Sequence, residues 1–100
     1  MNRQPEEYID EPFEDVINKQ HVIQIERYQD IPLDRYWFDI TNKRVLLFMP
    51  TKKRFKILKG SPVNINNKQY NYFGLIDVKG KSKTRSYDKF IKHLINCMCD

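Results

Sequence analysis

The sequence lacks several features that would place it in a familiar class of protein. Its longest purely apolar run covers residues 45–49, far short of the roughly 18 residues that a membrane-spanning helix needs. The N-terminal residues are acidic and contain no apolar stretch, so we expect no secretory signal. The two cysteines, Cys97 and Cys99, are too close together to staple distant parts of a fold. These shortages predict an intracellular protein without membrane contact.

Groups that carry chemistry are also scarce. The chain has two histidines, His21 and His93, no recognisable nucleophile motif and no cluster of carboxylates within its basic part. His93, Cys97 and Cys99 are the only candidates for metal ligands. His93 and Cys97 would share one side of a helix, whereas Cys99 points elsewhere and the Cys-x₂-Cys pattern of zinc sites is missing. The sequence therefore predicts a protein that is not an enzyme and has no metal or cofactor.

Gly80-Lys81-Ser82 has the letters that close a phosphate-binding loop, but its surroundings do not fit a nucleotide site. Five residues separate it from Gly74, whereas such a loop requires four. The residues that follow alternate like a strand, where a phosphate loop would open a helix. We therefore predict a hairpin turn in which Gly80 supplies the positive φ.

The charges are divided unevenly along the chain. The net charge is +5, but residues 1–15 carry six acids and one arginine, a net of −5, so residues 16–100 carry +10. Between Lys43 and Lys92 there are fourteen lysines or arginines and only two acids, Asp77 and Asp88. A field of this sign attracts phosphate backbones, which predicts contact with nucleic acid. An ordinary solvated surface, or a basic component of a ribosome-like assembly, is the alternative.

The hydrophobic pattern predicts an α+β fold, with a small antiparallel sheet of hairpins and a C-terminal amphipathic helix packed on one face. We expect an acidic flexible arm at residues 1–15 and a single basic domain at residues 16–100. Strands are expected at residues 21–26, 36–40, 44–48, 55–59, 70–78 and 83–87, with a turn at 31–34 and an amide-rich loop at 64–69. The helix is capped by Ser86 or Asp88, and its apolar side chains are Phe90, Ile91, Leu94, Ile95 and Met98.

Three basic clusters supply the candidate contacts to nucleic acid. They comprise Lys43, Arg44, Lys52, Lys53, Arg54, Lys79, Lys81, Lys83 and Arg85. Lys83 and Arg85 are two apart in a strand and should project together, about 7 Å apart. A two-stranded ribbon of this kind fits the major groove, whereas a charged edge that prevents sheet aggregation is the alternative. The amides at residues 64–69 could pair with adenine or only form turns.

Several short motifs between residues 26 and 96 follow one another in a characteristic order. They are Tyr28-Gln29-Asp30-Ile31-Pro32, a hairpin at residues 38–45, the strand from Tyr70, the Gly80-Lys81 turn and the final helix. This order resembles the DNA-binding module found beside HNH homing endonucleases of phages and large viruses. The sequence contains no His-Asn-His motif and lacks the hairpin glycine of that family, so no nuclease activity is implied. The resemblance implies DNA contact at Lys43, Arg44, Lys81, Lys83 and Arg85.

These observations together predict a non-catalytic nucleic-acid-binding protein, with DNA preferred to RNA. It would act in the host cytoplasm or nucleus, or in the virion if the protein is viral. Two other classes stay open: a structural or adaptor component of a nucleoprotein or viral assembly, and a small inhibitor that acts through protein–protein contacts. Exposed Tyr8 and Phe13 in the acidic arm would provide a site for a protein partner.

Overall fold

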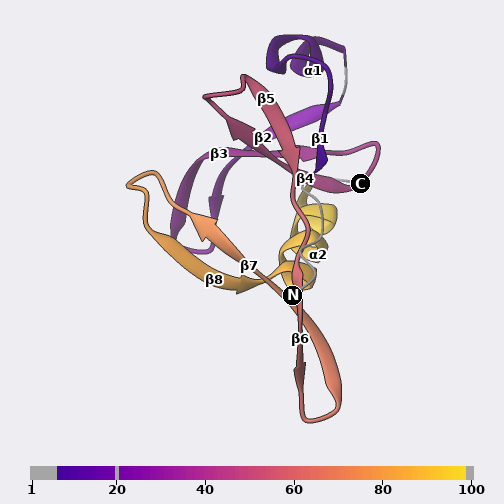
Figure 1. Ribbon diagram of the computed structural model, residues 1–100, viewed down its shortest axis with the longest axis vertical. Coiled ribbons are helices and arrows are strands. Elements are labelled where there is room, and N and C mark those ends of the chain that lie inside the picture. Colours follow the sequence, from indigo (N-terminus) through magenta and orange to yellow (C-terminus); the bar gives the residue numbers. More distant parts are fainter. Residues whose placement is uncertain (1–6, 20, 99–100) are drawn as a thin grey trace.

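The strands form two antiparallel sheets, and a helix follows the last strand (Figure 1). The computed structural model describes residues 7–19 and 21–98. The elements are β1 (Glu7–Tyr8), α1 (Phe13–Lys19), β2 (Val22–Tyr28), β3 (Ile31–Asp39), β4 (Arg44–Met49), β5 (Arg54–Ile57), β6 (Ser61–Ile65), β7 (Lys68–Ile76), β8 (Ser82–Ser86) and α2 (Tyr87–Met98). One sheet has the order β1-β5-β4-β3-β2 and the other β6-β7-β8. The predicted α+β fold is confirmed.

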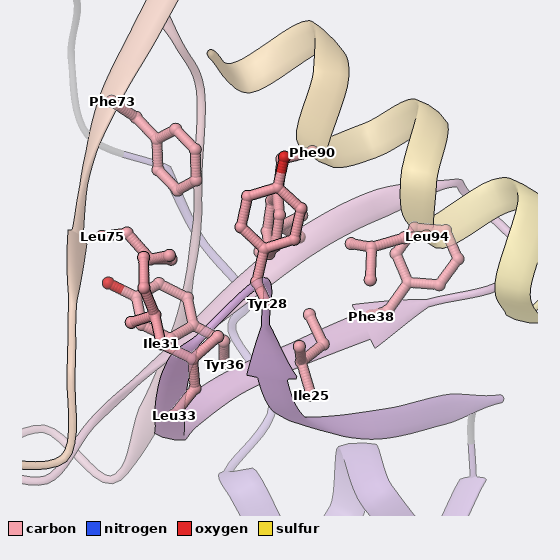
Figure 2. Close-up of a cluster of buried hydrophobic side chains, with 11 residues drawn as sticks. Ile25, Tyr28, Ile31, Leu33, Tyr36, Phe38, Phe73, Leu75, Phe90 and Leu94 are labelled. Carbon is pink, nitrogen blue, oxygen red and sulfur yellow. The ribbon is translucent and has the colours of Figure 1, made fainter. Parts of the chain in front are cut away.

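The larger hydrophobic core lies between the two sheets and α2 (Figure 2). Its buried residues are Ile25, Tyr28, Ile31, Leu33, Tyr36, Phe38, Val45, Phe73, Leu75, Phe90 and Leu94. Phe90 and Leu94 come from the predicted apolar face of α2, and the Ser86 hydroxyl caps the helix by accepting a hydrogen bond from the Lys89 N–H (3.3 Å). The side chain of Met98 lies outside the described part of the chain. Burial of this face, more than helix propensity, holds α2 in place.

Tyr36 joins the two sheets through this core. Its hydroxyl, on β3, accepts a hydrogen bond from the backbone N–H of Ile76 on β7 (2.8 Å). Burial raises the pKa of the Tyr36 phenol, so the hydroxyl stays protonated at neutral pH. A second link follows directly, because the Val78 N–H donates to the Pro32 carbonyl (3.1 Å). The start of β3 and the end of β7 are therefore held side by side.

A second core covers the opposite face of the five-stranded sheet, under α1. Ile9, Val16, Leu46 and Phe55 are buried there. Phe13 packs among three other aromatic rings, those of Trp37, Phe48 and Phe55. The prediction that Tyr8 and Phe13 are exposed is wrong, since both are half-buried within the fold.

The N-terminal acidic segment therefore belongs to the folded domain wherever the structure describes it. β1 pairs with β5, and α1 runs across the predicted boundary at residue 15. The prediction of a flexible arm was wrong for residues 7–15 because it rested on the acidic composition of the segment and on its two prolines, Pro5 and Pro12. Glu14 and Asp15 occupy the first turn of α1, where the helix dipole stabilises carboxylates, while Val16 faces the sheet. Residues 1–6 lie outside the described residues.

Two segments that were predicted to be irregular are strands. β3 begins at Ile31, so the turn expected at 31–34 is instead an extended segment paired with β2. The amide-rich loop expected at 64–69 comprises the end of β6, a two-residue turn and the start of β7. Asn66 and Asn67 form the turn with positive φ (50° and 65°), and the residues on either side of them pair. Asparagine tolerates this conformation, which makes a tight hairpin of the kind that favours strand twist.

Candidate nucleic-acid interface

The nine predicted cations lie in three separate places. Lys43 and Arg44 lie where β3 turns into β4, whereas Lys52, Lys53 and Arg54 lie where β4 turns into β5. β4 separates these two groups by about 17 Å at the usual rise per residue. The other four cations lie on the β7–β8 hairpin, which belongs to the second sheet. The fold therefore does not gather the nine into one surface.

Arg44 is occupied by a structural contact. Its Nε donates to the Asp39 Oδ2 atom at 3.0 Å, and Asn42 adds bonds from its backbone N–H (3.2 Å) and side-chain amide (2.8 Å). Burial raises the pKa of Asp39, but these hydrogen bonds outweigh it and hold the pKa below its usual value. Arg44 thus serves to compensate a fully buried carboxylate. Beside it, an open depression of about 370 Å³ is lined by Lys19, His21, Thr41, Asn42 and Arg44.

The turn between β4 and β5 also makes contacts that stabilise the fold. The Lys53 carbonyl accepts a hydrogen bond from the Phe13 N–H (3.0 Å), which fixes the start of α1. The Lys52 Nζ atom lies 4.1 Å from the centre of the Tyr8 ring, within the range of a cation–π contact. Only Lys53 and Arg54 keep exposed side chains without a described internal role.

The β7–β8 turn has the geometry that the sequence predicted. Gly80 takes a φ of 84°, and the Asp77 N–H donates to the Lys81 carbonyl (2.9 Å). The Asp77 Oδ1 atom accepts bonds from the backbone N–H groups of Lys79 and Lys81, both at 2.9 Å. The bond from Lys81 is the main reason that the pKa of Asp77 lies below its usual value, and the charges of Lys83 and Lys81 act in the same direction. The turn is thus rigidly held while its lysine side chains remain exposed.

Lys83 and Arg85 project from the same face of β8, as predicted. They pair with Leu75 and Phe73, which are buried, so both cations point toward the side of the sheet that carries the core. β8 is an edge strand, which leaves them at the rim of that core. The Arg85 Nε atom donates to the Gln29 Oε1 atom (3.2 Å) and so reaches the turn between β2 and β3.

Lys89, a cation of α2, was not among the contacts predicted from the sequence. The His93 ring meets the Tyr28 ring edge to face at 5.3 Å, next to the residue that Arg85 contacts. Lys89 lies one helical turn before His93 and hence on the same side of α2. Because α2 follows β8 directly, Lys89 lies three residues after the end of β8 and follows its cations along the chain. We call Lys79, Lys81, Lys83, Arg85 and Lys89 the basic edge.

The predicted proximity of His93 and Cys97 is present, with the Cys97 Sγ atom 3.9 Å from Nδ1 and 3.8 Å from Nε2. In the part of the chain that the structure describes, no three His, Cys, Asp or Glu side chains come together as metal ligands would. Cys99 lies outside that part. Neither helix of residues 7–19 and 21–98 is long and apolar enough to cross a membrane.

No protein-family model, curated protein or solved structure matches the chain. The fold and the site define a small α+β domain with a basic edge.

Proposed function

We propose that the protein binds nucleic acid without catalysis, DNA in preference to RNA, through phosphate contacts of the basic edge. The observation that carries this proposal is the row of five cations that runs from the β7–β8 turn into α2. Two carboxylates accompany the row: Asp77 accepts two backbone hydrogen bonds of its own turn, and Asp88 accepts a hydrogen bond from the Asn71 side-chain amide (3.3 Å). Five cations against these two carboxylates leave a net positive charge to meet phosphates, and the scarcity of cysteine favours an intracellular setting.

The basic edge is better suited to phosphates than the other two clusters. Its turn is anchored by the Val78–Pro32 hydrogen bond, which limits the entropy lost when the turn meets a ligand. Lys79, Lys81 and Lys83 are exposed, whereas Arg44 is engaged by Asp39 and Lys52 lies over Tyr8. The resemblance to the HNH-associated module also implies contact at Lys81, and its Gly80-Lys81 turn is the one that opens this edge.

The salt dependence of binding tests this proposal. Logarithmic affinity should fall linearly with logarithmic salt concentration, by about 0.9 per phosphate neutralised on a duplex and about 0.7 on a single strand. Changing Lys79, Lys81 and Lys83 together to serine should reduce that slope by about 2.7 on a duplex and about 2.1 on a single strand. The matched control changes Lys43, Lys53 and Arg54 to serine, which removes the same charge elsewhere and should reduce the slope much less. Equal reductions in both variants would contradict the assignment of the basic edge.

A further inference from the structure

The β6–β7 hairpin projects from the rest of the domain (Figure 1). Every residue from 61 to 70 is exposed, and the hairpin ends in the tight Asn66-Asn67 turn. A two-stranded hairpin with no core of its own is only marginally stable in water. The exposure of this regular hairpin therefore points to a role in binding.

The two faces of this hairpin differ in chemistry. The cross-strand pairs Val63–Tyr70 and Ile65–Lys68 lie on one face, together with Tyr72. Val63, Ile65 and Tyr70 are 40%, 45% and 38% exposed, so apolar side chains face solvent. The opposite face carries Pro62, Asn64, Gln69 and Asn71, and continues into the side of β7 that covers α2. The apolar face, which we call the outer face, is thus turned away from the core.

Strand addition at β6 is an unsuitable use of this hairpin. Ile65 and Lys68 flank a two-residue turn and exchange backbone hydrogen bonds with each other, as do Val63 and Tyr70. The backbone groups of Pro62 and Asn64 consequently point to the free edge. Proline has no N–H to offer there, which blocks the pairing of another strand. The binding feature is the outer face and not the edge.

Lys68, Tyr70 and Tyr72 form a straight row on the outer face of β7. The two tyrosine rings have centroids 6.3 Å apart and planes inclined by 38°. Beyond them Gly74 has no side chain on this face, and an added Cβ there would lie 2.8 Å from the Ser82 Oγ atom. The sequence contains no acid between residues 60 and 76. The row therefore presents two aromatic rings and one cation, while the carboxylate of Asp88 contacts Asn71 on the opposite face of β7.

We infer that the outer face binds single-stranded nucleic acid, with successive bases stacked on Tyr70 and Tyr72 and a phosphate near Lys68. This inference rests on the proposed function and deepens it, because it names the form of nucleic acid. Unpaired bases stack on neighbouring aromatic rings whatever their sequence, whereas the paired bases of a duplex do not offer their faces. The net charge of +5 complements a polyanion.

A second copy of the chain fits the outer face less well. Its exposed apolar side chains are few and each less than half exposed, so they supply far less than the ~800 Å² per partner of a stable interface. A symmetric pair would also bring two Lys68 side chains and two basic domains together. Charge and area thus favour a nucleic-acid strand over self-association.

Fluorescence anisotropy with three labelled probes tests this inference: a 15-nucleotide oligothymidine, a 15-nucleotide oligouridine and a 15-base-pair duplex. The variant Tyr70→Leu/Tyr72→Leu keeps apolar area but removes the rings. We expect it to bind both single strands about 10- to 100-fold more weakly, with duplex affinity almost unchanged. The matched control Tyr70→Phe/Tyr72→Phe retains the rings and should bind single strands within about threefold of the parent protein.

The outcomes separate this inference from the proposed function. A leucine variant that binds oligothymidine as well as its parent overturns the stacking role and leaves the basic edge in place. A parent protein that binds none of the probes at low salt overturns both. Sedimentation of the parent as a dimer and of the leucine variant as a monomer would assign the outer face to self-association and overturn the inference.

Discussion

The two sheets differ in how their faces are covered. The five-stranded sheet is buried on both faces, by α1 on one and by α2 with the second sheet on the other. Neighbouring residues of β4, Val45 and Leu46, are fully buried on opposite faces. The three-stranded sheet buries Phe73 and Leu75 on one face and leaves Tyr70 exposed on the other. The first sheet is therefore covered on both sides, and the second leaves one face open to solvent.

The largest effect is expected from breaking the covered face under α1. Phe55→Ala should lower the free energy of unfolding by about 3–5 kcal/mol, because removal of a ring packed against Phe13 and Trp37 leaves a cavity. Tyr70→Ala on the uncovered face should cost less than about 1 kcal/mol, since that side chain is partly solvated. Urea denaturation of the two variants measures this contrast. Similar losses would show that the two sheets do not differ as described.

A smaller effect is expected at the junction between the sheets. Tyr36→Phe removes the hydroxyl that accepts the Ile76 N–H and should cost about 1–3 kcal/mol, because the donor is left without its partner. In this variant, amide hydrogen exchange should accelerate more at Ile76 than in the strands of the five-stranded sheet. Unchanged stability together with unchanged exchange at Ile76 would contradict the role of this link.

The smallest effect is expected from acid. The folded-state pKa of Asp39 lies below its ordinary value of 3.8, so its contribution to stability is complete above that pH and is lost as pH falls through the folded pKa. Asp77 acts in the same direction. The unfolding free energy should therefore decline below about pH 4, by at most about 1.4 kcal/mol per pH unit for Asp39. Asp39→Asn should flatten this decline in urea titrations between pH 2 and 5, and an identical decline in parent and variant would exclude Asp39 as its source.

Elements with strong local signals could be predicted from the sequence. The β3–β4 hairpin follows from two apolar strands around residues 41–43, and α2 from a cap at Ser86 followed by apolar residues at helical spacing. Gly80 marked the β7–β8 turn because glycine adopts positive φ without strain. In each case the residues that decide the structure lie within a few positions of one another.

Features that depend on distant partners could not be predicted. α1 is stabilised by Leu46 and Phe55, which lie far along the chain, so its own acidic composition was misleading. Arg44 counted as a free cation until the fold placed it against a buried Asp39. The exposure of the outer face could not be predicted either, because the sequence of the strand at Tyr70 is the same whether its tyrosines face a core or solvent. Burial is decided by the other sheet and by α2, not by the strand itself.

The salt dependence of oligothymidine binding tests the central claim most directly. We predict that the parent protein binds with an affinity that falls steeply as salt rises, and that serine at Lys79, Lys81 and Lys83 reduces this slope by about 2. Serine at Lys43, Lys53 and Arg54 should reduce it much less. The same slope in the parent and the basic-edge variant would contradict the claim that this edge meets a phosphate backbone.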